Sequence, residues 1–89
     1  MVERSDEYII GRLIERSRLL IALSEEIPVE TKLQTQPLLK QLEQALSVPP
    51  LEQDQAHVRG TYAVLYGELA DYADLEALLS ALRNFVPYL

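Results

Sequence analysis

The sequence predicts an all-α protein, a compact bundle of four main helices that forms a single domain over residues 1–89. Apolar residues recur three and four positions apart along most of the chain, which is the period of helices with one buried face. No segment alternates apolar and polar residues over the length of a strand. Five prolines divide the chain into helix-sized segments.

The first helix is expected at about residues 5–26. Ser5 can cap its N-terminus, where Asp6 and Glu7 suit the positive end of the helix dipole. Pro28 ends it, because the residue before a proline disfavours helical backbone. The apolar arc of this helix is broad enough to face a core. It consists of Ile9, Ile10, Leu13, Ile14, Leu20, Ile21 and Ile27.

A short helical turn near 29–34 and a second main helix at 36–47 follow. Val29 and Leu33 share one helical face, whereas the leucines that come after them repeat on another. The change of phase falls at residues 35–37, and a proline suits the first turn of a helix better than its interior. The sequence therefore predicts a break there.

The third and fourth helices are expected at about 50–73 and 75–86, after a pair of prolines and before Pro87. Their apolar stripes are rotated far apart, so one continuous helix could not keep both on one core. A corner is therefore expected at residues 72–74, with Asp74 capping the fourth helix. The core stripe of the third helix consists of Leu51, Val58, Tyr62, Leu65, Leu69 and Tyr72.

The third helix also carries a line of small residues at heptad spacing, which we call the small-residue face. It consists of Ala56, Gly60, Ala63, Gly67 and Ala70. Such a line lets another backbone approach closely. Each exposed glycine in a helix interior costs about 0.8–1.0 kcal/mol relative to alanine, so a compensating contact is expected. Either another helix of the same chain, such as the first, crosses this face, or a second copy or a partner helix does. The remaining alternative is that the line of small residues arises by chance.

A second candidate surface lies on the first helix, away from its apolar arc, and we call it the arginine–leucine face. It consists of Tyr8, Arg12, Arg16, Leu19 and Leu23. Tyrosine and arginine beside exposed leucines are typical of interface hot spots. The alternative is that the tyrosine ring and the arginine stems cover the rim of the core.

The net charge of −6 is carried entirely by residues 21–89, since residues 1–20 hold four basic and four acidic groups. An acidic surface repels phosphate backbones, so a nucleic-acid partner is not expected. The longest apolar run has five residues and the N-terminus is too charged for a secretory signal, so no membrane partner is expected. Without cysteine there is no disulfide framework, which favours a cytoplasmic protein.

No motif predicts catalysis, a cofactor, a metal or a small-molecule substrate. His57, the single histidine, comes three residues after Asp54 near the start of the third helix, so we expect it to be a helix-end residue near its capping acid. The sequence places no nucleophile at a spacing that would pair with it. Glu68, Asp71 and Asp74 lack the dense ligand series and the turn glycine of a calcium loop.

These observations favour a non-enzymatic protein–protein interaction module, such as an adaptor, a small subunit or an assembly factor. It would act through helix–helix packing, as a homodimer or with a partner protein, using the small-residue face and the arginine–leucine face. The alternative is an acidic inhibitor, immunity or antitoxin-like protein that masks a basic surface of its partner. Its binding face would consist of Glu68, Asp71, Asp74 and Glu76.

Overall fold

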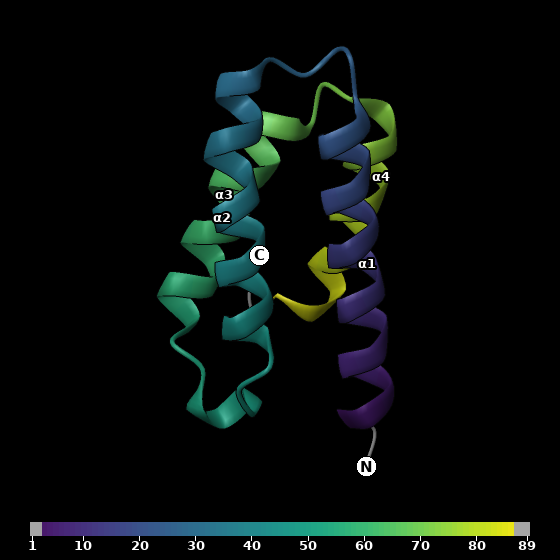
Figure 1. Ribbon diagram of the computed structural model, residues 1–89. Coiled ribbons are helices and arrows are strands. Elements are labelled where there is room, and N and C mark those ends of the chain that lie inside the picture. The colour runs from purple at the N-terminus through teal and green to yellow at the C-terminus, as the bar shows by residue number, and fades with distance from the viewer. Residues whose placement is uncertain (1–2, 87–89) are drawn as a thin grey trace.

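The computed structural model describes residues 3–86, with side chains from Asp6 onward except at Pro50. Four α-helices run alternately up and down through this range (Figure 1), and no strand occurs in it. They are α1 (Glu3–Leu23), α2 (Val29–Leu46), α3 (Gln55–Leu69) and α4 (Ala73–Leu82). Two short 3-10 helices, η1 (Pro50–Glu52) and η2 (Arg83–Phe85), precede α3 and follow α4. The predicted all-α four-helix bundle is confirmed.

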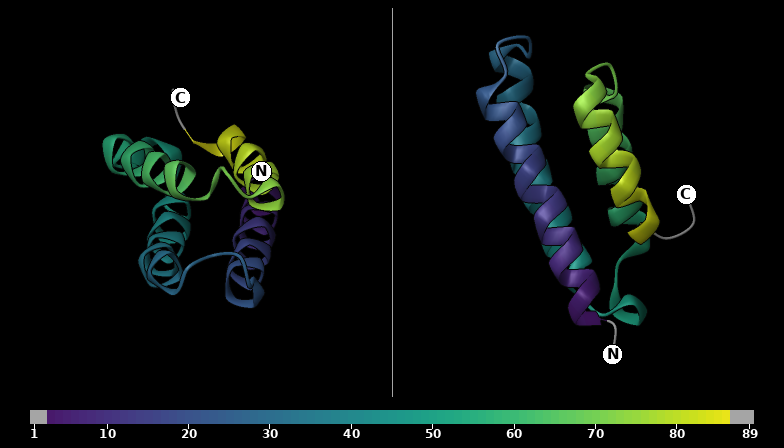
Figure 2. Two further views of the ribbon diagram at one scale, coloured as in Figure 1. Left: turned by 90° about the horizontal axis from the view of Figure 1, so that it is seen from above. Right: turned by 90° about the vertical axis from the view of Figure 1, so that its right-hand side faces the viewer.

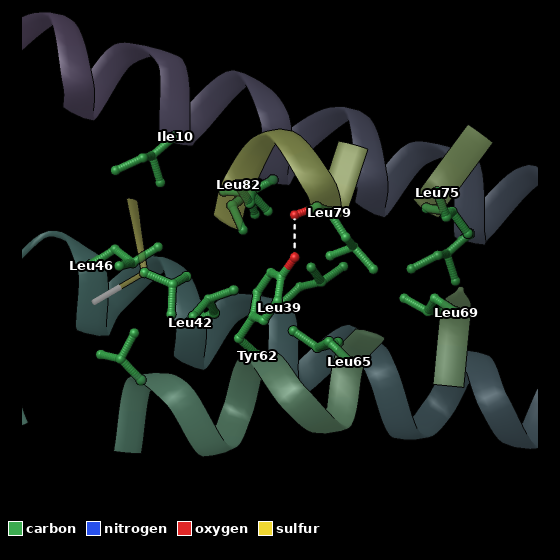
Figure 3. Close-up of a cluster of buried hydrophobic side chains, with 14 of the residues drawn as sticks. Ile10, Leu39, Leu42, Leu46, Tyr62, Leu65, Leu69, Leu75, Leu79 and Leu82 are labelled. Atoms are coloured by element: carbon green, nitrogen blue, oxygen red, sulfur yellow. Dashed lines mark hydrogen bonds between the residues drawn. The ribbon is translucent and has the colours of Figure 1, made fainter. Parts of the chain in front are cut away.

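The helices occupy the corners of a quadrilateral when the bundle is seen from above, with α1 diagonally opposite α3 (Figure 2). Accordingly, α2 packs against both α1 and α3, and α4 packs mainly against α1. Each helix contributes one stripe of buried side chains to a shared core (Figure 3). The core consists of Ile10, Ile14, Ile21, Ile27, Leu39, Leu42, Leu46, Val58, Tyr62, Leu65, Leu69, Leu75, Leu79, Leu82 and Val86.

Helix α2 continues through Pro37, so the predicted turn at 29–34 and the break before a helix at 36–47 are wrong. That prediction rested on the face that Val29 and Leu33 share, yet these two side chains are 67% and 71% exposed. Thr35 extends the buried stripe instead, and its Oγ1 donates a hydrogen bond to the Thr31 carbonyl at 2.7 Å. The buried residues of α2 therefore lie along one face of a continuous helix. Burial of this face offsets the free energy lost because Pro37 has no N–H for a helical hydrogen bond.

Helix α1 differs from the prediction at both ends. It already includes Ser5, which is therefore not its N-cap, and it ends at Leu23 rather than near residue 26. The Ser24 hydroxyl accepts hydrogen bonds from the backbone N–H groups of Glu26 and Ile27, at 3.0 and 3.2 Å, and this turns the chain out of the helix. Ile9, expected in the buried arc, is exposed.

Helix α3 begins at Gln55, later than predicted, because Asp54 caps it by accepting a hydrogen bond from the His57 backbone N–H at 3.2 Å. The residues just before it form η1, where Leu51 is fully exposed and not part of the core stripe. The other predicted stripe residues within α3 are buried as expected; they are Val58, Tyr62, Leu65 and Leu69.

The corner between α3 and α4 falls at residues 70–72, close to its predicted place. Tyr72 is the N-cap of α4, and Asp74 lies in the first turn, where its charge still suits the helix dipole. The predicted cap at Asp74 is therefore wrong. Helix α4 ends at Leu82 and is followed by η2, so the expected end at residue 86 is wrong; Pro87 itself lies outside the described residues.

Candidate interaction surfaces

The small-residue face of α3 points away from the core. Helical geometry places it opposite Val58, Leu65 and Leu69, which are fully buried. Its first four members are exposed and the last is half-buried. These are Ala56, Gly60, Ala63, Gly67 and Ala70.

The two glycines of this face border open space. A Cβ built on Gly60 or Gly67 would meet no described atom within 4 Å outside the local helix backbone. The interpretation in which another helix of this chain crosses the face is therefore wrong for the described residues. Val64 borders the face and is also exposed, so it adds apolar area there.

The arginine–leucine face of α1 also points outward, opposite Ile14 and Ile21. Its apolar members are well exposed, with Tyr8 at 67% and Leu23 at 77%, so this tyrosine does not cover the rim of the core. The Arg12 guanidinium lies 6.0 Å from the centroid of the Tyr8 ring, in a cation–π arrangement. A shallow hollow beside this pair is lined by Arg12, Glu15, Arg16, Leu19, Leu20 and Leu23.

The two faces do not form one site. Helices α1 and α3 lie on a diagonal of the bundle (Figure 2), and each face points away from the core that separates them. A partner bound to one face therefore leaves the other accessible.

The most connected polar side chains link α3 to α4 on the inner side. The Tyr62 hydroxyl donates to the Leu79 carbonyl (Figure 3), and burial raises the pKa of this tyrosine. The Tyr66 hydroxyl donates to Glu76 Oε2 at 2.9 Å, which raises the pKa of Tyr66. Ser80 donates to the same oxygen at 2.8 Å, and the two hydrogen bonds lower the pKa of Glu76. These groups are engaged in packing the two helices together.

The remaining predicted acidic residues, Glu68, Asp71 and Asp74, are exposed near the α3–α4 turn. Among the side chains that the structure describes, no three of His, Cys, Asp or Glu converge as metal ligands would. Within residues 3–86, none of the helices combines the length and apolar character needed to cross a bilayer. His57 is exposed in the first turn of α3.

A third surface was missed at the sequence level, a groove of about 350 Å³ at the end of the bundle where the α1–α2 loop meets the α3–α4 turn. We call it the loop-end groove. It is lined by Leu20, Leu23, Ser24, Glu26, Ile27, Tyr72, Ala73, Asp74 and Leu75. Its two halves are distant in the sequence and meet only because the helices run up and down (Figure 1), so no local pattern could have predicted it.

Comparison with known proteins gives no assignment. No protein-family model matches the sequence, and searches against curated proteins and against solved structures found no significant match.

Proposed function

We propose that this chain is a non-enzymatic protein–protein interaction module, and that the small-residue face of α3 packs against the same face of a second copy. The observation that supports this most strongly is the open space at Gly60 and Gly67. Each glycine costs about 0.8–1.0 kcal/mol relative to alanine in an exposed helix. Nothing within the described chain requires that loss, whereas the close approach of another backbone would.

A two-fold arrangement suits this face. An isologous dimer buries one patch against its own copy, so a single small-residue line serves both sides. The face runs the length of α3, and the exposed Val64 at its edge supplies apolar area that the gap between two closely packed backbones would bury. The cysteine-free composition supports a cytoplasmic location for such a module.

The test is the double variant Gly60→Ala/Gly67→Ala, examined by sedimentation velocity and by thermal unfolding of the dilute monomer. Because a Cβ has open space at both positions, the monomer should gain about 1.6–2.0 kcal/mol of stability from helix propensity alone. The same methyl groups hold two backbones apart, so the dimer dissociation constant should rise at least about tenfold.

Gly11→Ala is the matched control. Gly11 also lies in a helix, and its Cβ would be 3.9 Å from Glu43 Oε2, an ordinary contact. The variant should stabilise the monomer in the same way and leave dimerisation unchanged. A wild-type chain that stays monomeric at high concentration, or a dimer that survives Gly60→Leu/Gly67→Leu, contradicts the proposal.

A second candidate role, masking a basic surface of a partner, is favoured by the gathering of exposed carboxylates at one end of the bundle. Glu25 and Glu26 lie in the α1–α2 loop; Asp71, in the α3–α4 turn, and Asp74, in the first turn of α4, belong to the same end of the bundle (Figure 1). Glu76, expected in that face, is instead held by two hydrogen bonds. Binding through this end should weaken in high salt, whereas packing through the small-residue face should persist.

A further inference from the structure

We propose that the loop-end groove binds a basic amphipathic segment of a partner protein, with an apolar side chain in the groove and Lys or Arg side chains beside Glu26 and Asp74. This inference rests on the proposed interaction role but concerns a surface other than the small-residue face. It also defines the chemistry of a partner.

The interior of the groove is apolar, and residues from the α1–α2 connection and from the α3–α4 connection both contribute to it. Ile27 and Leu75 are buried beneath it, Leu20 and Tyr72 are half-buried, and Leu23 is 77% exposed at its margin. A volume of about 350 Å³ is at the lower end of the range for ligand pockets, which suits one or two side chains. Filling the groove would remove from water the apolar surface that the fold leaves there.

Charge identifies the kind of segment that fits. Glu26 and Asp74 line the groove and are exposed. The exposed Glu25 precedes Glu26 in the α1–α2 loop, and the exposed Asp71 lies in the α3–α4 turn, three residues before Asp74. The nearby Lys32 ammonium donates to the carbonyls of Ala22, at 3.2 Å, and Ser24, at 2.7 Å, so its hydrogen bonds go to the end of α1 rather than to these carboxylates.

An apolar floor between two acidic margins complements an apolar residue flanked by cations. The apolar contact would supply most of the affinity, and the charges would speed encounter and select against acidic partners. The same charges repel nucleic acids and anionic lipid surfaces, so a basic protein segment is the occupant that the groove favours.

The probe is a fluorescein-labelled synthetic peptide of leucine and lysine with helical periodicity, titrated with the full chain by fluorescence anisotropy. Two matched peptides accompany it, one with glutamate for every lysine and one with serine for every leucine. We expect only the leucine–lysine peptide to bind, and its affinity to fall as salt is raised. Amide resonances of Glu26, Ile27 and Asp74 should shift on binding in heteronuclear NMR spectra.

Charge reversal locates the site. Glu26→Lys/Asp74→Lys should raise the peptide dissociation constant at least about tenfold. Asp6→Lys/Glu52→Lys makes the same change in net charge at the opposite end of the bundle and should change it less than about twofold. Equal losses in both double variants would show that only the overall charge matters and would overturn the proposal. Binding of the serine–lysine peptide as tight as that of the leucine–lysine peptide would overturn it as well.

Failure here is distinguishable from failure of the proposed function. The monomeric Gly60→Leu/Gly67→Leu variant keeps the groove intact, so it should bind the peptide as the wild-type chain does. A chain that dimerises through α3 but does not bind the peptide contradicts only the groove assignment. A chain that binds the peptide but never dimerises contradicts only the α3 assignment.

Discussion

Helices α1 and α3 both present an outer face to solvent, yet the two faces have opposite compositions. The face of α1 carries large side chains, including Tyr8 and the 77% exposed Leu23, whereas that of α3 carries only alanine and glycine. Large flexible side chains can adapt to many partner surfaces, while a smooth line of small residues favours one close helix–helix geometry. Under the proposed interaction role, the two faces would contact partners in two distinct ways.

The two helices are also held differently on their inner sides. Helix α1 is linked to α2 by polar side chains that reach its backbone, since Lys32 Nζ donates to the Ala22 carbonyl at 3.2 Å and Gln36 Nε2 to the Arg18 carbonyl at 3.1 Å. Helix α3 is linked to α4 by its own tyrosines. None of these hydrogen bonds uses a side chain of the outer face of α1 or α3.

The largest expected effect separates inner from outer positions. Leu65→Ala removes a fully buried side chain of α3 and should lower the free energy of unfolding by about 2–5 kcal/mol. Leu19→Ala/Leu23→Ala truncates the exposed face of α1 and should lower it by less than about 1 kcal/mol in total. Urea denaturation measures both. A loss in the outer double variant as large as that of Leu65→Ala would mean that this face supports the core.

A smaller effect is expected where α3 is tied to α4. Tyr62→Phe keeps the buried ring but removes the hydroxyl that donates to the Leu79 carbonyl, which still accepts the Arg83 backbone N–H. The free energy of unfolding should fall by about 1 kcal/mol. Tyr66→Phe should cost less, because the Glu76 carboxylate that it leaves can be solvated. If chemical denaturation showed a greater fall in the free energy of unfolding for Tyr66→Phe than for Tyr62→Phe, the exposed hydrogen bond would be the more important of the two.

The fold class and most core positions follow from the sequence because helical periodicity records which face is buried. The errors arise where exposed apolar residues were counted in the helical pattern. Val29, Leu33 and Leu51 are exposed, while the polar Thr35 and Ser17 are fully buried, each bonded to a carbonyl one turn back in its own helix. A hydroxyl that donates to a carbonyl of its own helix can be buried at little cost in free energy. Because such a residue is polar, a search for apolar periodicity does not identify it as a core residue.

The candidate surfaces were predictable to different degrees. The small-residue face and the arginine–leucine face each lie on one helix, so local spacing identified their members. Whether anything covers the face at Gly60 is a tertiary property, and only the packing of the other helices away from it shows that nothing in the described chain does. The loop-end groove is lined by residues as far apart in the sequence as Glu26 and Asp74, so only the three-dimensional structure could identify it.

The smallest expected effect is pH-dependent and concerns the α3–α4 link alone. Hydrogen bonds from Ser80 and Tyr66 lower the folded-state pKa of Glu76 below its ordinary value of 4.5. A lowered pKa favours the carboxylate, so this contribution to stability is present above that value and is lost as pH falls through the folded-state pKa. Glu76→Gln should therefore destabilise the chain at neutral pH, and the difference from wild type should shrink in acid.

Gln36→Ala provides the control for this pH dependence, because the amide that links α2 to α1 does not titrate. Its effect on the free energy of unfolding, followed by urea denaturation from neutral pH into acid, should stay constant while that of Glu76→Gln declines. A Glu76→Gln effect that stays constant would mean that the carboxylate charge contributes nothing to holding α4 on α3. The α3–α4 hydrogen bonds would then depend on pH no more than the α1–α2 hydrogen bond of Gln36 does. The inner sides of α1 and α3 would differ only in which groups are hydrogen-bonded, and not in their response to protonation.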